Sequence, residues 1–303
     1  MASRDTSFQP LPRALTIAGF DPSGGAGVLA DVRTFAAFGF QASAVITSIT
    51  FQNTGRVFGA THQTPEAVRA QVLPLLDEGK FVCAKIGMLP TRAVILEVAR
   101  LFRENDLPRP VLDPVIMSSS GERLMEEGGL DALIQELLPL TCLVTPNIPE
   151  AEALTGTRIT SEAGMQQAAA IIRELGAPAV LIKGGHLKKH EAGGRRQEPG
   201  AKVQEDGSPA ISTGAKAQSE DESDDAIDVL NNEGRVTVFR EQRVAGAELH
   251  GSGCILSVGI DAGLGKGMTL EGSVAAAKSF VLDAIRNSAH VARPPGAKQD
   301  DES

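Results

Sequence analysis

The chain has 303 residues, of which 42% are hydrophobic and 22% charged, a composition typical of a globular protein with one large domain or two small ones. Its formal net charge of −9 argues against electrostatic binding of nucleic acid. The sequence has no apolar run of about 18 residues, which argues against a membrane span. Three widely spaced cysteines and an N-terminus without an apolar signal core indicate a reducing, cytoplasmic location.

Apolar runs of strand length alternate with helical patterns along most of the chain. Strands are predicted at 14–20, 43–50, 81–87, 110–115, 142–146 and 179–185. Helices are predicted at about 25–38, 65–77, 91–104, 129–137 and 161–175, and two more, joined by GLGKGMT, at 251–291. This alternation is typical of βαβ units and predicts an α/β fold whose mostly parallel sheet is covered on both faces.

One segment interrupts the pattern. Between Lys188 and Ala226 the only large aliphatic residues are Val203 and Ile211, and the segment ends in an acidic run. Burial of so little apolar area does not offset an ordering entropy of about 1–2 kcal/mol per residue. We therefore predict a disordered, low-complexity insertion at 188–226 within a single domain at 13–293, with loose ends at 1–12 and 294–303.

Polar residues and glycines follow each predicted strand at its carboxyl end. The sequences there are GFDPSGGAG (19–27), TFQNTG (50–55), KIGM (85–88), LDPV (112–115), TPNIPE (145–150) and KGGH (183–186). Because parallel strands end along one edge of their sheet, these segments predict a ligand groove along that edge. The sequence has no P-loop, no G-x-G-x-x-G after the first strand and no G-x-S-x-G elbow, which argues against those nucleotide-binding and hydrolase classes.

The sequence HGSGC (250–254) places a thiol where a predicted helix begins. Three chemistries fit it: a Cys254 nucleophile with His250 as its base, a metal site, or a nest of backbone N–H groups for an anion. No acyl-transfer machinery accompanies the pair, and two ligands without a companion cluster do not make a zinc site. Of the three, the nest remains, in which the helix N-terminus attracts an anion to the N–H groups of Gly251, Ser252, Gly253 and Cys254. Taken alone, the loop is also consistent with an ordinary helix N-cap with a buried thiol behind it; the other motifs, given next, favour the nest.

Seven motifs of the chain, in this order and spacing, resemble those of the hydroxymethylpyrimidine/phosphomethylpyrimidine kinases of the ribokinase-like superfamily. They are LTIAGFDPSGGAGVLADVRTFAAFG, VITSITFQNT, KIGML, VLDPVIMSSSG, TPNIPEAEALTG, IKGGH and HGSGC. The resemblance covers about residues 13–187 and 227–290. It implies a three-layer α/β/α ribokinase-like fold. It also implies ATP-dependent phosphorylation of 4-amino-5-hydroxymethyl-2-methylpyrimidine, and then of its monophosphate, in thiamine biosynthesis.

The resemblance implies a pyrimidine pocket made by Gln52, Asp31, Met88, Val115 and Gly25. The primary amide of Gln52 offers a donor and an acceptor side by side, which suits the exocyclic amine and adjacent ring nitrogen of an aminopyrimidine. Asp31 is expected near the substrate hydroxyl or the ring. Taken alone, Asp31 is more typical of a solvated or capping carboxylate, and Met88 and Val115 of core residues.

The resemblance also places Asp113, Asn147, Glu150 and Lys183 around ATP and Mg²⁺. Glu150 and Asp113 are expected to act on the ion, partly through water, because Mg²⁺ prefers hard oxygen ligands and retains water. Lys183 is a mobile point charge suited to phosphate oxygens. Taken singly, each of the four is consistent with an ion pair at a loop, and SSSG (118–121) with either a flexible flap or a plain surface loop.

Cys254 occupies the place where most ribokinase-like enzymes have a general-base Asp, and the pyrimidine kinases are similar to this chain in having Cys. A helix N-terminus lowers the pKa of a thiol, so a thiolate base is feasible, although a loose transition state demands little deprotonation of the alcohol. Ser252 stands where Thr is commoner, a change that the backbone N–H tolerates.

Two alternatives to this function stay open. One is a pyridoxal or pyridoxine kinase of vitamin B6 salvage, since relatives with this Cys loop phosphorylate that ring; Gln52 with Met88 favours the pyrimidine. The other is a non-catalytic sensor of a pyrimidine or nucleotide, against which the set of Asp113, Glu150 and Lys183 argues. The expected partners are small molecules, without nucleic acid or membrane, and a homodimer is expected as in relatives.

Overall fold

The computed structural model describes residues 10–118, 121–185, 225–242 and 249–291. Within them, nine strands form one sheet in the order β3-β2-β1-β4-β5-β6-β7-β8-β9. Their bounds are β1 (Arg13–Phe20), β2 (Gln41–Gln52), β3 (Val57–His62), β4 (Cys83–Ile86), β5 (Val111–Leu112), β6 (Leu143–Val144), β7 (Ala179–Lys183), β8 (Asp225–Asn232) and β9 (Arg235–Gln242). The strands from β2 to β7 in this order run parallel, whereas β3 pairs antiparallel with β2, β8 with β7 and β9 with β8.

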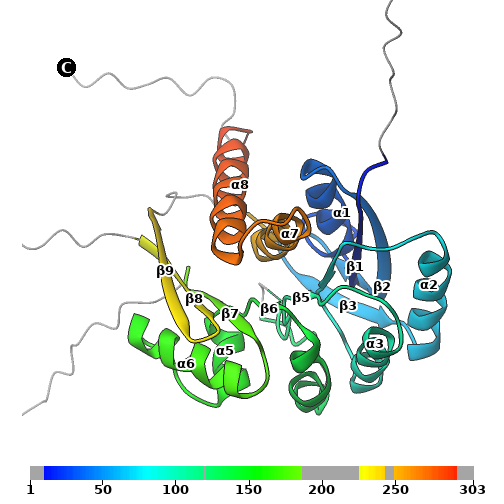
Figure 1. Cartoon of the computed structure of the whole chain (residues 1–303), viewed down its shortest axis with the longest axis horizontal. Coiled ribbons are helices and arrows are strands. Elements are labelled where there is room, and N and C mark those ends of the chain that lie inside the picture. The colour runs from blue at the N-terminus through cyan, green and yellow to red at the C-terminus, as the bar shows by residue number, and fades with distance from the viewer. Residues whose placement is uncertain (1–9, 119–120, 186–224, 243–248, 292–303) are drawn as a thin grey trace, which may run out of the picture.

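Helices cover both faces of the sheet (Figure 1). One face carries α1 (Gly27–Ala37), α7 (Ser252–Gly265) and α8 (Leu270–Val291). The other carries α2 (Pro65–Asp77), α3 (Arg92–Glu104), α4 (Gly129–Ala132) with a π-helical turn (Leu133–Leu137) and a 3-10 turn (Leu138–Leu140), α5 (Ile148–Thr155) and α6 (Glu162–Glu174). The predicted three-layer α/β/α arrangement with a mostly parallel sheet is confirmed.

The central strands are apolar along their length because helices cover both of their faces. Leu15 and Ile17 of β1 pack on the side of α2 and α3, whereas Leu181 of β7 packs on the side of α7 and α8. Helix α7 is apolar nearly all round, since it lies between the sheet and α8 and also contacts α1. HGSGC leads into the N-terminus of this buried helix, so the surrounding layers fix the position of that loop.

The sequence pattern misses three strands and one helix. Strands β3, β8 and β9 mix polar and apolar residues, because they lie at or next to the edges of the sheet. Helix α5 has only 8 residues and begins at Ile148, inside a motif assigned to ligand binding. The predicted insertion is wrong at its C-terminal end, because residues 225–226 belong to β8 and pair with β9.

The remaining predictions of domain organisation fall largely on other parts of the chain. Residues 188–224 of the predicted insertion, and the predicted loose ends at 1–9 and 294–303, lie outside the described residues. Residues 10–12 have no regular structure, although the Pro12 carbonyl accepts a hydrogen bond from the N–H of Gln41. Domain bounds of 13–293 stay a prediction. In the part of the chain that is described, no helix is long and apolar enough to cross a membrane.

Candidate active site

The carboxyl ends of the parallel strands bring several of the predicted residues together. At the end of β7, Lys183 Nζ donates to Oδ1 of Asp113, which follows β5, at 2.7 Å. Thr145, after β6, donates to the same oxygen at 3.1 Å. Although burial opposes both shifts, each partner stabilises the charge of the other, so the pKa of Asp113 is lowered and that of Lys183 is raised. The site therefore holds a fixed, charged Lys183.

Asn147 and Glu150 form the capping box of α5. The Asn147 side chain accepts from the N–H of Glu150 at 2.9 Å, and the Glu150 carboxylate accepts from the N–H of Asn147 at 2.8 Å. The spacing Asn-x-x-Glu is a recognisable sign of a helix start, which the ligand assignment overlooked. Burial raises the pKa of Glu150 to about 7, with Lys183 lowering it and Asp113 raising it. The predicted contacts of both residues with ATP or Mg²⁺ stay predictions.

The first glycine turn packs directly against the loop that leads into α7. Gly251 has a φ of 78°, and a Cβ at this position would lie 2.0 Å from the carbonyl oxygen of Gly25. Only glycine combines that conformation with so close an approach. A Cβ at Gly25 would in turn lie 2.3 Å from Cδ2 of His250. Gly25 thus packs against the loop at 250–254, which is the candidate phosphate site. Its contact with a substrate stays a prediction.

Three of the four N–H groups predicted to form the anion nest are available. The N–H of Ser252 donates to the carbonyl of Leu249 at 3.1 Å in a tight turn, so its predicted role as a donor is wrong for this structure. Among the described residues, the N–H groups of Gly251, Gly253 and Cys254 have no acceptor. A Cβ at Gly253 would lie 3.1 Å from Lys183 Nζ, so this ammonium borders the nest. Unpaired N–H groups, a helix N-terminus and an ammonium together favour a phosphate group.

The expected lowering of the Cys254 pKa is wrong. The side chain is half-buried, and its burial raises the pKa of the thiol to about 11. Lys85 lowers this pKa, but the charges of Asp31 and Asp113 raise it further. Cys254 is therefore a thiol at neutral pH.

Asp21, which was not predicted as a site residue, links the first turn to two other segments. Its carboxylate lies 3.1 Å from Nε2 of His250 and accepts from the N–H of Ala26 at 2.9 Å. The Gln52 side chain, at the end of β2, donates to the same carboxylate. Burial raises the pKa of Asp21, but the hydrogen bonds from Gln52, Ser23 and Ala26 outweigh it and lower the pKa below its usual value. The Asp-Pro-Ser-Gly turn is the sequence signal that identifies such a residue.

The other residues of the predicted pyrimidine pocket lie nearby, without contacts that test their role. Met88 is buried, with its Sδ 2.9 Å from where a Cβ of Gly19 would be. Val115 is half-buried, and its N–H donates to the carbonyl of Asp113 at 2.9 Å. Asp31 is neither solvated nor a cap, because it is fully buried against Thr16 and Lys85. Asp31 has no exposed surface, so a ligand could contact it only after a rearrangement of the residues that cover it.

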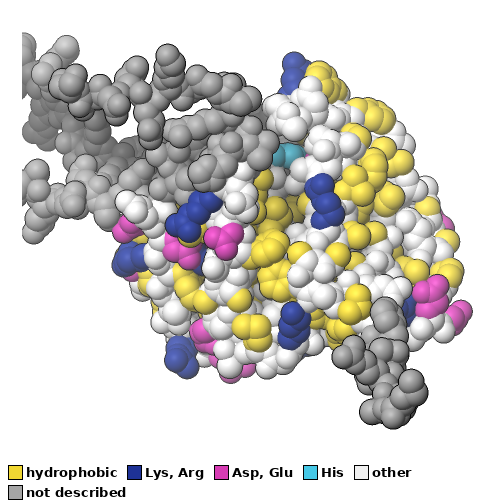
Figure 2. Space-filling view, turned by 90° about the horizontal axis from the view of Figure 1, so that it is seen from above, with side chains coloured by type: hydrophobic (Ala, Val, Ile, Leu, Met, Phe, Trp, Pro, Cys, Tyr) yellow, Lys and Arg dark blue, Asp and Glu magenta, His cyan; other side chains and the backbone are white. Residues whose placement is uncertain are grey.

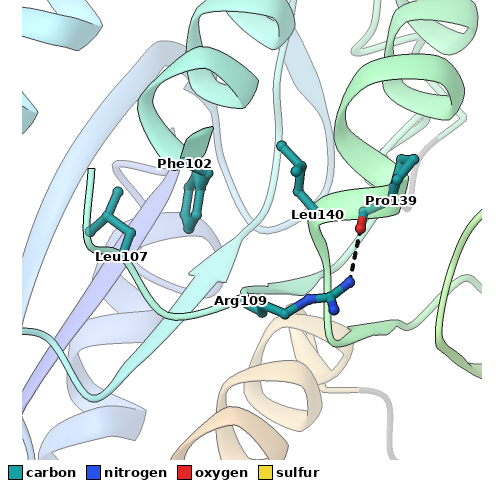
Figure 3. A pocket seen from close by; sticks show the side chains of 5 residues that line it. All are labelled: Phe102, Leu107, Arg109, Pro139 and Leu140. Carbon is teal, nitrogen blue, oxygen red and sulfur yellow. Dashed lines mark hydrogen bonds between the residues drawn. The ribbon is translucent and has the colours of Figure 1, made fainter. Parts of the chain in front are cut away.

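A cavity of about 290 Å³ lies at the opposite, amino-terminal edge of the sheet (Figure 3). It is lined by Phe102, Leu107, Arg109, Pro139 and Leu140. The Arg109 guanidinium donates to the carbonyls of Pro139 at 2.8 Å and Thr141 at 3.1 Å, so it serves the protein backbone. The cavity contains none of the chemistry-bearing residues above. Nowhere in the described residues do three or more His, Cys, Asp or Glu side chains form a metal-binding group.

Comparisons with known proteins agree with this geometry. The family described as phosphomethylpyrimidine kinase matches residues 21–214 and 197–297. A hydroxymethylpyrimidine/phosphomethylpyrimidine kinase of Aquifex aeolicus is 35% identical over 275 residues, which cover 91% of this chain and 94% of that protein. A solved phosphomethylpyrimidine kinase of Clostridium difficile has a TM-score of 0.70 and 31% identity, covering 90% of this chain and 99% of its own. An ADP complex of Bacillus subtilis pyridoxal kinase has a TM-score of 0.73 and 30% identity, covering 91% and 92%.

Proposed function

The chain belongs to the phosphomethylpyrimidine kinase family, and from that membership we propose that it transfers the γ-phosphate of ATP to hydroxymethylpyrimidine and then to its monophosphate, in thiamine biosynthesis. The observation that carries the proposal is the Lys183 ammonium beside the unpaired N–H groups at the start of α7. This arrangement suits the transferring phosphoryl group. The bound ADP of the Bacillus subtilis relative supports ATP as the donor.

In the proposed reaction the hydroxymethyl oxygen attacks the γ-phosphorus in line. Lys183 and the N–H groups of Gly251, Gly253 and Cys254 hold the charge that spreads over the transferring oxygens. Asp113 keeps Lys183 charged and fixed. Because Cys254 is a thiol at neutral pH, we assign it the role of a backbone donor, and a loose transition state demands little deprotonation of the alcohol before transfer.

Mg²⁺ is proposed to be held by Asp113 and Glu150, partly through water, together with the phosphates of ATP. The two carboxylates are close enough for the charge of Asp113 to raise the pKa of Glu150. They are too few to bind the ion by themselves, so the phosphates of ATP and water would supply the remaining ligands. Mg²⁺ usually keeps several waters and combines one or two carboxylates with substrate phosphates. When bound, it neutralises charge on those phosphates.

The pyrimidine is favoured over pyridoxal by the orientation of Gln52. One N–H of its amide donates to Asp21, which leaves the amide oxygen to accept from a substrate and the second N–H to donate to it. An exocyclic amine, as in the aminopyrimidine, supplies the matching donor. A ring without a donor at this place would leave the amide oxygen unpaired, which is costly.

The first test is the release of ADP by purified protein with Mg-ATP and, in parallel, hydroxymethylpyrimidine, its monophosphate and pyridoxal. Turnover of both pyrimidines with little turnover of pyridoxal is expected. Preferred turnover of pyridoxal would indicate a pyridoxal kinase. Ligand binding without turnover of any acceptor would favour a non-catalytic sensor.

A Lys183→Met variant tests the anion site itself. We expect kcat to fall about 100-fold to 1,000-fold, the usual cost of losing one preorganised donor to developing charge. Lys80→Met is the matched control, because Lys80 and its partner Asp106 are 83% and 80% exposed. Circular dichroism would check that both variants fold. Unchanged kcat in Lys183→Met would remove Lys183 from the proposed mechanism.

We also propose a homodimer that uses the β2–β3 edge of the sheet. Ile49 and Phe51 of β2 and Phe58 of β3 are exposed, with Phe58 at 62%. Figure 2 shows hydrophobic side chains gathered over the right half of the face drawn there. Exposed apolar patches of this kind mark interaction surfaces. Light scattering after gel filtration should give twice the chain mass for the wild type and the chain mass for Phe58→Asp; a monomeric wild type would refute the dimer.

A further inference from the structure

Lys85 is a fully buried cation in the centre of the sheet. It lies on β4, which is flanked by β1 and β5, and no part of its side chain is exposed. Its ammonium donates to both carboxylate oxygens of Asp31 on α1, at 3.1 and 3.0 Å. Thr16, the register partner of Lys85 on β1, donates to the same carboxylate at 2.6 Å. Two neighbouring strands thus hold one carboxylate.

Stability does not explain this pair. An ammonium has three N–H groups, and among the described residues two hydrogen bonds are made by Lys85, both to Asp31. A buried ion pair costs desolvation that its attraction only partly returns, and apolar residues of similar volume often stabilise a protein as much or more. Asp31 nevertheless raises the pKa of Lys85 against the effect of burial, so the charge persists.

The location of the pair points to the site. A Cβ at Gly87 would lie 2.8 Å from Lys85 Nζ, so this glycine leaves room for the ammonium at the end of β4. The charges that act most strongly on Cys254 are those of Lys85, Asp31 and Asp113, while Gly27 donates its N–H to the sulfur. Lys183 Nζ lies 3.1 Å from where a Cβ of Gly253, the neighbour of Cys254, would be. Lys85 therefore supplies a positive charge beneath the loop at 251–254.

We propose that Lys85 is a positioning residue for phosphoryl transfer: it fixes the carboxylate of Asp31 and balances its charge beneath Cys254. Lys85 touches neither substrate nor ATP, because its side chain is inaccessible, and it acts through these two residues. The inference rests on the proposed function for its catalytic meaning, whereas the charge balance at Cys254 is measurable without turnover.

The rate at which iodoacetamide alkylates Cys254, followed by mass spectrometry of its peptide between about pH 7 and 10, tests the charge balance, because only the thiolate reacts. Lys85→Met should slow the reaction about tenfold at a given pH, which corresponds to one pKa unit. Asp31→Asn should accelerate it, and the double variant should return close to the wild type. Shifts in opposite directions that cancel are expected from charge balance and not from a loss of packing.

Two further variants keep the test decisive. Gly87→Ala pushes the ammonium away without removing its charge, so it should slow alkylation even if Lys85→Met fails to fold. Lys278→Met removes the other buried lysine of the described chain that pairs with a buried aspartate, Asp228, and should leave Cys254 unchanged. Unaltered alkylation in folded Lys85→Met or Gly87→Ala would overturn the proposal.

Kinetics separates this inference from the proposed function. With the pyrimidine as acceptor, Lys85→Met should lower kcat and leave the KM of ATP within about twofold. The reason is that the charge balance lost with Lys85 stabilises the transition state and not the bound ATP. A wild type without turnover of any acceptor would refute the proposed function while the alkylation result still stood. A normal kcat in Lys85→Met would overturn the positioning role.

Discussion

Gln52 illustrates how a single side chain sets specificity. A free glutamine amide can turn over and present either its oxygen or its nitrogen to a ligand. Here Asp21 accepts from one N–H of the amide, and Asp21 is itself held by His250 and by the first glycine turn. The amide oxygen is thereby fixed as an acceptor before a substrate arrives, which reduces the entropy lost on binding.

Gln52→Leu should therefore impair use of the pyrimidine selectively. The expected loss in kcat/KM for hydroxymethylpyrimidine is about 10-fold to 100-fold, from a hydrogen bond worth about 1–3 kcal/mol. The KM of ATP should stay within about twofold. Initial-rate kinetics with each substrate varied in turn measures both. Gln166→Leu on α6 is the matched control, and an equal loss for both substrates would count against the assignment.

Single residues also mark the limit of prediction from the sequence. Lys85 stands in FVCAKIG and Asp261 in CILSVGIDAGL, each as one charge in an apolar element. That pattern is a usable signal, because an unpaired charge is expensive to bury. The partner of Lys85 is Asp31, 54 residues away in sequence, and only the fold reveals the pairing.

At the scale of elements, two glycine segments from opposite ends of the domain form one surface. The turn after β1 and the loop before α7 meet where Gly251 packs on Gly25, and His250 with Asp21 closes the contact. Each segment has a hydrogen-bonded turn: Asp21 accepts from the N–H of Ala26 in the first, and the N–H of Ser252 donates to the carbonyl of Leu249 in the second. Each is held by the other, so the anion nest depends on this contact as much as on α7.

Gly251→Ala should disrupt the nest, because its methyl group would collide with the Gly25 carbonyl and the φ of 78° would be strained. We expect kcat to fall at least about 100-fold, as for loss of an oxyanion donor. Gly39→Ala is the matched control: it has a φ of 79°, but no atom lies within 4 Å of its added Cβ. It should cost about 1–2 kcal/mol of stability and leave kcat unchanged. Similar kcat values for the two variants would refute the role of the contact.

The elements that the sequence predicts correctly are the central strands, which are buried on both faces, and amphipathic helices with one buried face. The parallel strands and the helices α2, α3 and α6 appear as apolar runs or periodic stripes, and the structure has them within a few residues. Strands β8 and β9 contain several charged and amide residues without a regular alternation, so neither strand has the apolar pattern that predicted the central strands. The family resemblance is confirmed, because seven spaced motifs carry more information than any one element.

At the scale of the whole molecule, α7 joins the site to the core. Its first turn provides the N–H groups, and about two turns further along the helix Asp261 is almost fully buried. Its Oδ2 has no hydrogen-bond partner within the described residues. Burial raises the pKa of Asp261 to about 8, against a hydrogen bond with Cys83. The folded protein thus keeps a proton that the unfolded chain loses.

The sign of the resulting pH dependence follows from this proton. Between the usual pKa of 3.8 and about 8, the unfolded chain is ionised at Asp261 while the folded protein is not, so the free energy of unfolding falls as pH rises. Asp261→Asn removes this term. Urea melts at pH 5, 6.5 and 8 should show that the free energy of unfolding of the variant rises relative to that of the wild type as the pH rises, by at most about 1.4 kcal/mol per pH unit.

Asp106→Asn is the control for that series, because the loss of this exposed carboxylate should leave the free energy of unfolding close to that of the wild type at each pH. Parallel pH curves for the wild type and Asp261→Asn would show that Asp261 is ionised in the folded protein.

The register of β7 and β8 has a consequence for how this chain can be rebuilt. Lys183 and Asp228 are paired across the two strands, so the chain departs from the sheet and rejoins it at one place. An insertion or deletion between residues 185 and 225, outside both strands, should leave this pairing intact, because doubling the length of a loop costs only about 0.6 kcal/mol. The connection between β7 and β8 is therefore a suitable place to insert a foreign domain or to shorten the chain. It lies next to Lys183, which we propose binds the phosphate.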